Sequence, residues 1–330
     1  MNIKNDFSLK DILWYRIGGK AKYLLDIAGR DDLEQAIKFL EEHDLYKNKK
    51  YIVTGLGSNL VFKDDYFDGA VIRFVPSKDK KRSFVVEKYN KLLVTAYAGE
   101  TLDDLILFSF QKGLIGLEWA GGLPGTVGAA VRGNVGAFGK EIKDSFCEAE
   151  ILKLRNGGRY IFINGFINKK MNFSYRQSIV KQEKHMLILY ATFLLQKATP
   201  EQLKRAKEVY EANISYRKLH HPLEYPNCGS VFKNIKQKEE VAKVLEVWPD
   251  VAEMVTTKWY GKVSMGYIIH RLGFAGFKLG NAQVSEKHNN FIVNLGEAKS
   301  KDVLAIINMI QKKVQETFGF MPEVEVEVVK

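Results

Sequence analysis

The amino-acid sequence predicts a mixed fold of the α/β or α+β class, and three observations support this prediction. Apolar residues alternate between strand-like and helix-like periodicities from Lys22 to about Leu195. The 330 residues, of which 46% are hydrophobic, are enough to bury a large core in two or three domains. The character of the sequence changes at Thr199, which places a domain boundary near Gln196.

The predicted strands in the first part of the chain are short apolar runs. They cover residues 23–27, 51–54, 70–74, 92–98, 148–154, 160–163 and 186–195. Asp31 and Asp32 precede apolar residues at helical spacing, so we predict a helix after the first strand. A second helix begins at Thr101, where Asp104 can cap the first turn, and it ends near Gly113, which suits a left-handed conformation.

The C-terminal part is predicted to contain several helices. Thr199 and Pro200 mark the start of one, because threonine can cap a helix and proline fits its first turn. Further helices are predicted at about 239–247, 263–272 and 300–318. Gly319 ends the last of them. A strand is predicted at 291–294, and strict alternation at 324–328 predicts a half-exposed final strand.

The formal net charge of +11 would suit a polyanionic partner. Lysines nevertheless lie among acidic residues, and no basic stripe is interleaved with aromatic residues as in single-strand binders. Nucleic acid is therefore not an expected partner, and a basic nucleotide-binding or RNA-associated protein is kept as the non-enzyme alternative. A basic cleft would also attract phosphate-bearing small molecules.

The sequence carries no membrane, secretion or metal signal. It lacks a stretch of ~20 consecutive apolar residues, and its first residues lack the apolar core of a secretory signal. We therefore expect a cytoplasmic protein that does not enter membranes. Cys147 and Cys228 are far apart and lack metal-ligand spacing, so no metal site is expected.

A first glycine loop directly follows the predicted strand 51–54. Its glycines allow the backbone to approach a ligand closely, and its amide and hydroxyl groups can cradle a pyrophosphate. It lacks the spacing of the dinucleotide-binding fingerprint and of the P-loop. Its candidate cofactor-binding residues are Gly55, Leu56, Gly57, Ser58, Asn59 and Leu60.

A second glycine loop covers residues 121–130 and continues through Gly133, Asn134 and Gly136. Four glycines, one proline and two alanines within ten residues leave much of the backbone bare. Each glycine costs conformational entropy on folding, so the loop is expected to bind or pack against something, and we favour a cofactor. The candidate cofactor-binding residues here are Gly121, Gly122, Pro124, Gly125, Thr126, Gly128 and Ala129.

The two loops belong to a set of six motifs that occur in order along the chain. The other four are Tyr175-Arg176, the segment 229–234 (GSVFKN), the segment 281–285 (NAQVS) and Pro322-Glu323. Together they resemble the UDP-N-acetylenolpyruvoylglucosamine reductase family, over nearly the whole chain. The interval from Arg176 to Ser230 is too short for the tyrosine-bearing insertion of the longer form of the family. The chain is therefore similar to the shorter form.

This resemblance implies an α+β fold similar to the vanillyl-alcohol oxidase and p-cresol methylhydroxylase flavoproteins. Two FAD-binding subdomains would cover residues 1–75 and 76–195, and a substrate-binding domain would cover 196–330. The final strand, 322–330, would return towards the flavin site. The two glycine loops would hold the pyrophosphate of FAD and line its isoalloxazine ring. Because neither loop contains histidine or cysteine, we expect FAD to be bound without a covalent link.

The resemblance also implies an activity in peptidoglycan synthesis. NADPH, as co-substrate, would reduce FAD, and flavin N5 would pass a hydride to the vinyl carbon of UDP-N-acetylglucosamine enolpyruvate to give UDP-N-acetylmuramate. Arg176 would lie beside the substrate carboxylate, where its planar fork can bind both oxygens. Ser230 would donate the proton. Glu323, protonated or sharing a hydrogen bond, would stabilise the enolate-like state together with Arg176.

Substrate contacts are implied for Tyr175, Arg217, Lys218 and Asn234, of which the arginine and the lysine suit the diphosphate. We expect the chain to act as a monomer. The competing enzyme class is a sugar or alcohol oxidase of the same flavin fold, which would pass electrons to oxygen. Those oxidases often tether FAD through histidine or cysteine.

Overall fold

The computed structural model describes residues 1–77, 83–88, 91–155 and 159–329. The chain forms two compact units, each assembled from separate stretches of sequence. Unit 1 comprises Met1–Phe7, Ala21–Leu56 and Asp68–Arg217, and unit 2 comprises Ser8–Lys20, Gly57–Phe67 and Lys218–Lys330. The predicted boundaries of three domains stay a prediction, whereas the mixture of helices and strands in both units confirms the α+β class.

Unit 1 contains a four-stranded sheet in the order β1-β2-β5-β3. These strands are β1 (Asn2–Ser8), β2 (Lys20–Ile27), β5 (Phe67–Phe74) and β3 (Tyr51–Thr54). β3 and β5 are parallel, with Tyr51 opposite Ala70. Helix α1 (Arg30–Glu42) covers this sheet, because its apolar stripe shares a buried cluster with Leu25 and Ile72. Pairing with β5 and packing against this cluster hold β3, the strand that leads into the first glycine loop.

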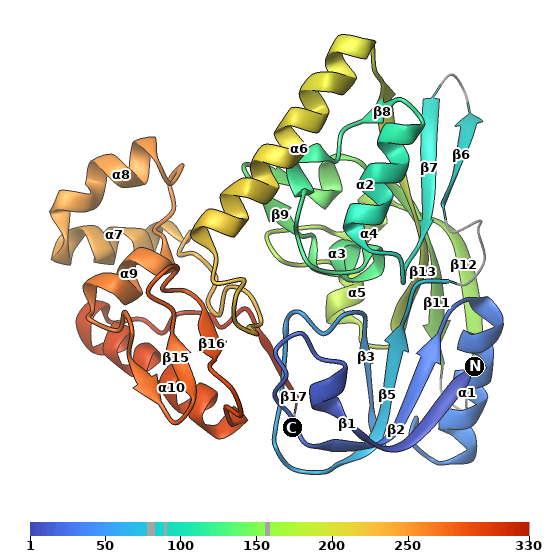
Figure 1. Ribbon diagram of the computed structural model, residues 1–330, viewed down its shortest axis with the longest axis horizontal. Helices are drawn as coiled ribbons and strands as arrows, with labels where there is room; N and C mark the ends of the chain where they lie inside the picture. Colours follow the sequence, from blue (N-terminus) through green and yellow to red (C-terminus); the bar gives the residue numbers. More distant parts are fainter. Residues whose placement is uncertain (78–82, 89–90, 156–158, 330) are drawn as a thin grey trace. The chain divides into compact units, whose positions relative to one another are not determined.

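The second sheet of unit 1 has the order β12-β11-β13-β7-β6, and β8 pairs with β13. Its strands are β6 (Ser83–Lys88), β7 (Lys91–Tyr97), β8 (Leu114–Ile115), β11 (Phe146–Leu154), β12 (Tyr160–Ile167) and β13 (Met186–Lys197). The paired strands are antiparallel. Figure 1 shows α2 and α6 on one side of this sheet. All of these elements contribute to one hydrophobic cluster, so unit 1 has a continuous core.

The remaining α-helices of unit 1 are α2 (Leu102–Gln111), α3 (Val127–Gly133), α4 (Asn168–Met171), α5 (Ile179–Gln182) and α6 (Pro200–His220), whose last residues belong to unit 2. Two short strands, β9 (Gly136–Ala137) and β10 (Lys140–Glu141), pair after the second loop. The predicted start of α2 is confirmed, because the Thr101 hydroxyl accepts a hydrogen bond from the backbone N–H of Asp104.

Unit 2 consists of helices around a small antiparallel sheet of the order β14-β15-β16. Its helices are α7 (Lys238–Val247), α8 (Ala252–Thr257), α9 (Met265–Arg271) and α10 (Ser300–Phe318). The sheet strands are β14 (Lys278–Leu279), β15 (Ala282–Val284) and β16 (Ile292–Asn294). Helix α10 has the predicted bounds, and Gly319 ends it in the left-handed conformation, with φ of 72°.

The final strand differs from the prediction. β17 covers Glu327–Val329 and pairs in parallel with β4 (Leu60–Phe62), rather than alternating regularly over 324–328. The preceding residues pair elsewhere: the backbone N–H of Glu325 donates to Val231 O at 2.7 Å. Because the segment changes partner, the alternation breaks: Val326 is buried and Val328 is exposed, although a regular strand would put both on the same face.

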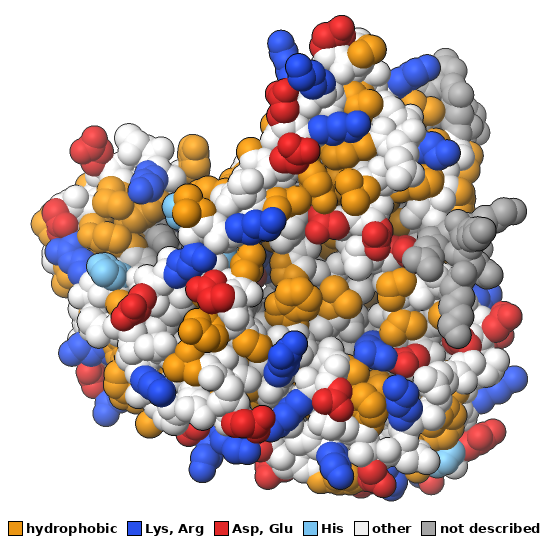
Figure 2. Space-filling view, in the orientation of Figure 1, with side chains coloured by type: hydrophobic (Ala, Val, Ile, Leu, Met, Phe, Trp, Pro, Cys, Tyr) orange, Lys and Arg blue, Asp and Glu red, His pale blue; other side chains and the backbone are white. Residues whose placement is uncertain are grey.

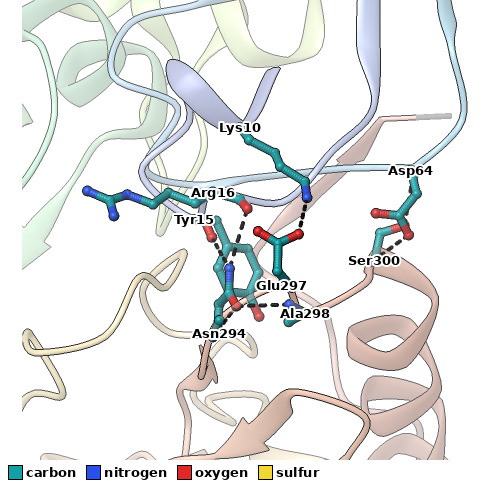
Figure 3. A network of polar contacts seen from close by, with 9 residues as sticks. Lys10, Tyr15, Arg16, Asp64, Asn294, Glu297, Ala298 and Ser300 are labelled. Atoms are coloured by element: carbon teal, nitrogen blue, oxygen red, sulfur yellow. Dashed lines mark hydrogen bonds and ion pairs between the residues drawn. The ribbon is translucent and has the colours of Figure 1, made fainter. Parts of the chain in front are cut away.

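Asn294 ties the N-terminal segment of unit 2 to its C-terminal part, as Figure 3 shows. Its side-chain amide donates to the backbone oxygens of Tyr15 and Arg16 at 3.2 and 3.3 Å. Its side-chain oxygen accepts from the backbone N–H groups of Gly296 and Ala298 at 2.9 and 3.0 Å. Only 3% of Asn294 is exposed, so these groups depend on one another for hydrogen bonds.

Replacing Asn294 with alanine is expected to lower the free energy of unfolding by about 2–4 kcal/mol, because buried backbone groups lose their partners. Urea denaturation of the variant measures the loss. Asn48→Ala is the control, since Asn48 is exposed and the change should stay within about 0.5 kcal/mol. An Asn294→Ala variant as stable as Asn48→Ala would contradict this account.

Candidate active site

Backbone hydrogen bonds join the second glycine loop to the end of β7. The N–H of Val127 donates to Glu100 O at 2.8 Å, and the N–H of Gly128 donates to Ala98 O at 2.9 Å. A Cβ atom on Gly128 would lie 2.7 Å from the Cβ of Ala98. Two segments can approach so closely only where one residue lacks a side chain. Packing within the protein therefore accounts for part of the glycine content that the sequence led us to assign to a cofactor.

Gly121 has a similar requirement at the start of the loop. A Cβ atom there would lie 2.6 Å from the ring of Tyr210 and 2.8 Å from its backbone oxygen, on helix α6. Gly121→Ala is therefore expected to lower the free energy of unfolding by about 1–3 kcal/mol through overpacking. It should also weaken FAD retention, measured as the flavin-to-protein ratio after gel filtration.

The control for Gly121→Ala is Gly29→Ala. Gly29 has an extended backbone and open space around its Cβ position. The control should change stability by no more than about 0.5 kcal/mol. If both variants unfold like the unmodified chain, the close approach of α6 to the loop is not a constraint.

The first glycine loop is divided between the two units. Gly55 lies in unit 1, where an added Cβ would be 2.5 Å from the Thr126 hydroxyl, so the two glycine loops adjoin there. Residues from Gly57 onward lie in unit 2, where the Asn59 side chain donates to Glu325 O at 3.3 Å. The structure therefore brings Gly55 to the second loop and pairs Asn59 and Leu60 with the C-terminal segment. Leu56 belongs to unit 1 with Gly55, and Gly57 and Ser58 belong to unit 2.

Arg176 lies in a tight turn next to the end of the second glycine loop. Its Nη2 donates to Gly136 O at 3.1 Å, and its φ of 59° is unusual for a residue with a side chain. The fully buried Asn134 donates to Ser174 O at 2.9 Å, and the Ser178 hydroxyl donates to Arg132 O at 2.6 Å. Because this strained turn is held by several hydrogen bonds, it has the character of a functional position.

Arg217 is buried on α6 against the second glycine loop. Its Nε donates to Gly121 O at 3.0 Å, and its guanidinium lies 5.3 Å from the centre of the Phe138 ring. Burial lowers the pKa of this guanidinium, an effect that the nearby Asp103 charge opposes, and arginine remains charged in proteins. Its Nη2 has no hydrogen-bond partner among the described residues, although only 5% of Arg217 is exposed.

Ser230 and Glu323 lie on paired segments of unit 2. The backbone N–H of Lys233 donates to Glu323 O at 3.0 Å, and Phe232 and Val324 form an antiparallel bridge. On the other side, the N–H of Val231 donates to Asn290 O at 2.8 Å. The segment that carries Ser230 is thus held between two others. Arg176 belongs to unit 1, whereas Ser230 and Glu323 belong to unit 2.

The glutamate of this pair also forms an ion pair. Lys233 Nζ contacts Glu323 Oε1 directly. The lysine side chain is 8% exposed and the glutamate side chain is 67% exposed, so a buried ammonium holds a carboxylate that faces outward. Cys228, two residues before Ser230, has a thiol whose pKa burial raises to about 12, so it stays protonated and is a poor nucleophile.

The remaining predicted contacts are spread over both units. Tyr175 is half-buried in unit 1, and its ring lies 5.2 Å from the Arg176 guanidinium carbon. Lys218 is exposed, and its backbone oxygen accepts from Lys287 Nζ at 2.8 Å. The Asn234 side-chain oxygen accepts from the N–H of Met265 at 3.1 Å, at the start of α9. No role in ligand binding follows from these contacts alone.

Sequence reasoning missed three residues that shape the site. Asn134 supports the Arg176 turn, and Asn290 exchanges hydrogen bonds with the backbone of Phe232 at 3.0 and 2.8 Å. Lys233 pairs with Glu323. Asn134 lies in the continuation of the second glycine loop, and Lys233 lies in the GSVFKN motif. A polar residue inside such a motif needs hydrogen-bond partners when it is buried, and this need could have singled out both residues.

The residues of unit 1 fit a phosphate-bearing cofactor of the FAD type. The unpaired Nη2 of Arg217 offers a buried donor and a positive charge beside the second glycine loop. The adjoining Gly55 and Thr126 bring both loops to the same place. The described residues contain no group of three histidine, cysteine, aspartate or glutamate side chains that could hold a metal ion.

The surface carries charges of both signs (Figure 2). Figure 2 shows acidic side chains scattered among lysines and arginines on the face drawn. The absence of a nucleic-acid partner stays a prediction. Within the described ranges, no helix has both the length and the apolar character needed to cross a bilayer.

Two family models match the chain. Residues 22–160 match "FAD binding domain", and residues 221–329 match "UDP-N-acetylenolpyruvoylglucosamine reductase, C-terminal domain". The first match covers both glycine loops and the second covers Ser230 and Glu323. Together they confirm the predicted FAD-binding fold with its C-terminal domain.

Curated relatives and one solved structure agree with these matches. The UDP-N-acetylenolpyruvoylglucosamine reductase of Caldicellulosiruptor saccharolyticus is 36% identical over 98% of this chain and 91% of its own length. That of Lactobacillus acidophilus is 31% identical over 100% of this chain and 95% of its own. The crystal structure of the enzyme of the same name from Thermus caldophilus has a TM-score of 0.70 and 26% identity over all of both chains.

Proposed function

The chain belongs to the UDP-N-acetylenolpyruvoylglucosamine reductase family, and we propose that it reduces UDP-N-acetylglucosamine enolpyruvate to UDP-N-acetylmuramate with NADPH as the electron donor. It is an FAD-dependent oxidoreductase of peptidoglycan synthesis that acts on a small molecule. The observation that carries the finer proposal is the pairing of the segment with Ser230 to the segment with Glu323, inside the matched C-terminal domain.

The two glycine loops would hold FAD, which would supply the hydride chemistry of the reaction at the vinyl carbon. We assign its pyrophosphate to the first glycine loop and its isoalloxazine ring to the second. Arg217 supports the second assignment because its Nε holds the Gly121 carbonyl at the start of that loop. Its predicted role towards the substrate diphosphate is kept as a proposal, with the donor being Nη2, which has no partner among the described residues.

Arg176 would bind the carboxylate of the enolpyruvyl group. Hydride addition at the vinyl carbon moves negative charge towards the neighbouring carbon and the carboxylate, and a fixed positive charge stabilises that state. Arg176 Nη2 donates to Gly136 O at 3.1 Å, which holds the guanidinium beside the end of the second glycine loop. A guanidinium carries five N–H donors in a planar fork that matches a carboxylate. The strained turn fixes the backbone from which the side chain extends.

Ser230 would deliver the proton to the carbon that bears the ether oxygen. A hydroxyl is a weak acid, so its efficiency depends on position and orientation rather than on a matched pKa. The positive φ of Gly229 and the hydrogen bonds of Asn290 to the next residues determine where Ser230 lies. This support is consistent with a group that acts through its placement.

Glu323 would stabilise the charge that develops on the substrate, either as an acid or through a shared hydrogen bond. Its contact with Lys233 places a positive charge beside the carboxylate, while 67% of the Glu323 side chain remains exposed. Tyr175, Lys218 and Asn234 are proposed as further substrate contacts. We also propose a monomer that works in the cytoplasm.

The test is anaerobic steady-state turnover of the purified chain. The proposal predicts a yellow protein whose flavin is released by trichloroacetic acid, and NADPH consumption that requires the enolpyruvyl substrate. Mass spectrometry should find a product heavier by two hydrogens. Flavin that stays with the precipitated protein, together with turnover that appears only when oxygen is admitted, would instead support an oxidase. A colourless protein would favour the nucleotide-binding alternative.

A further inference from the structure

The Lys233–Glu323 ion pair joins two adjacent segments by both backbone and side chain. The backbone N–H of Lys233 donates to Glu323 O at 3.0 Å, and the ammonium of the same lysine contacts the glutamate carboxylate. The residue that precedes Lys233 forms an antiparallel bridge with Val324. This register puts Glu323 beside a lysine that is three residues from Ser230.

The two side chains differ strongly in exposure, and this difference carries the inference. Lysine is almost never buried without a partner, because an unpaired ammonium loses much of its hydration energy. A glutamate with two-thirds of its side chain exposed would otherwise sample several rotamers. The buried ammonium of Lys233 therefore needs a Glu323 oxygen as its hydrogen-bond acceptor, and Glu323 needs Lys233 to keep one orientation.

A second acid nearby is consistent with this arrangement. Glu240 at the start of α7 has a raised pKa, mainly because of burial, with a further increase from the charge of Glu323 that Lys243 opposes. The charges of these two carboxylates thus interact, and Lys233 contacts one of them. Loss of the ammonium would remove the contact of Glu323 while the like charge of Glu240 remained.

We propose that Lys233 is a positioning residue for the reaction, which holds the Glu323 carboxylate where the enolpyruvyl substrate needs it. This inference rests on the proposed function. Lys233 acts through Glu323 and does not itself touch the reacting atoms. The pair should therefore behave as one unit in kinetics, so that removal of either member removes the same contribution.

The experiment measures both half-reactions of the holoenzyme separately by anaerobic stopped flow. In Lys233→Met, reduction of the flavin by NADPH should stay within about twofold of the unmodified chain, while reoxidation by the enolpyruvyl substrate should slow about 10- to 100-fold, as small misplacements do. Lys233→Arg keeps the charge and should recover part of this loss. Lys10→Met is the control, because it removes another ion pair of unit 2, at 2.6 Å.

A double-mutant cycle distinguishes positioning from general stability. Reoxidation of Lys233→Met/Glu323→Gln should be within about threefold of the slower single variant, because the two residues act as a unit. If the losses of the two single variants multiply in the double variant, the proposal is overturned. Normal reoxidation of Lys233→Met would also overturn it. If Lys233→Met does not fold, the same cycle is run with Lys233→Arg, whose loss must disappear in the Glu323→Gln background. A persistent loss would overturn the proposal.

The unmodified chain separates this inference from the function on which it rests. If its flavin is reduced by NADPH but not reoxidised by the enolpyruvyl substrate, the proposed function fails, whatever the variants do. If both half-reactions proceed and the Lys233 variants match the control Lys10→Met, only the positioning role fails.

Discussion

Ser230→Ala is expected to slow reoxidation of the flavin by the enolpyruvyl substrate by about 10²–10⁴-fold, the usual contribution of a placed proton donor. FAD should remain bound, because Ser230 lies outside both glycine loops. Reduction by NADPH should also remain, since that step needs no proton at the substrate carbon. Anaerobic stopped flow of the two half-reactions measures these outcomes.

The control for Ser230→Ala is Ser215→Ala. Ser215 is exposed on helix α6, so loss of its hydroxyl should leave both half-reactions unchanged. Normal reoxidation of Ser230→Ala would remove the proton-donor assignment. Loss of flavin in Ser230→Ala would show instead that the segment 227–235 supports cofactor binding.

Arg176→Lys is expected to lower the rate of reoxidation by about 10²–10³-fold, the loss found when one charge-stabilising donor is removed. An ammonium keeps the positive charge but cannot bind both carboxylate oxygens as a planar fork does. A lysine at this position also cannot reproduce the geometry of the hydrogen bond that Arg176 Nη2 donates to Gly136 O. Reduction by NADPH and retention of FAD should be unaffected.

The control for Arg176→Lys is Arg271→Lys. Arg271 forms a surface ion pair with Asp250 at 2.6 Å on α9, and such pairs contribute little. Its substitution should not change either half-reaction. If Arg176→Lys reacts as fast as Arg271→Lys, the arginine is not the carboxylate partner, and its strained backbone has another explanation.

Much of the fold could be predicted because its strongest signals are local. Thr101 caps its helix as predicted, and α10 has the predicted bounds because an apolar stripe and Gly319 mark them. The predicted bounds of the final strand were wrong because its segment pairs first with Val231 and then with β4. No local sequence pattern encodes such a change of partner. Unit 2 takes in the stretches Ser8–Lys20 and Gly57–Phe67 through tertiary contacts such as those of Asn294.

The site was predictable in its motifs and less so in its geometry. The sequence located the two glycine loops, but it did not reveal that Gly121 and Gly128 are required by Tyr210 and Ala98. Arg217 was predicted as a substrate contact, and its burial against Gly121 depends on the packing of α6. The pairing of Lys233 with Glu323 is a contact across 90 residues, which a single sequence cannot specify.

The central claim is that this chain passes electrons from NADPH to the enolpyruvyl group through FAD. The most direct test is an anaerobic titration of the purified protein, in which flavin absorbance is followed as NADPH and then UDP-N-acetylglucosamine enolpyruvate are added. The account predicts bleaching by NADPH and full recovery on addition of the substrate. Bleached flavin that recovers only when oxygen is admitted, or flavin that NADPH cannot bleach, would contradict it.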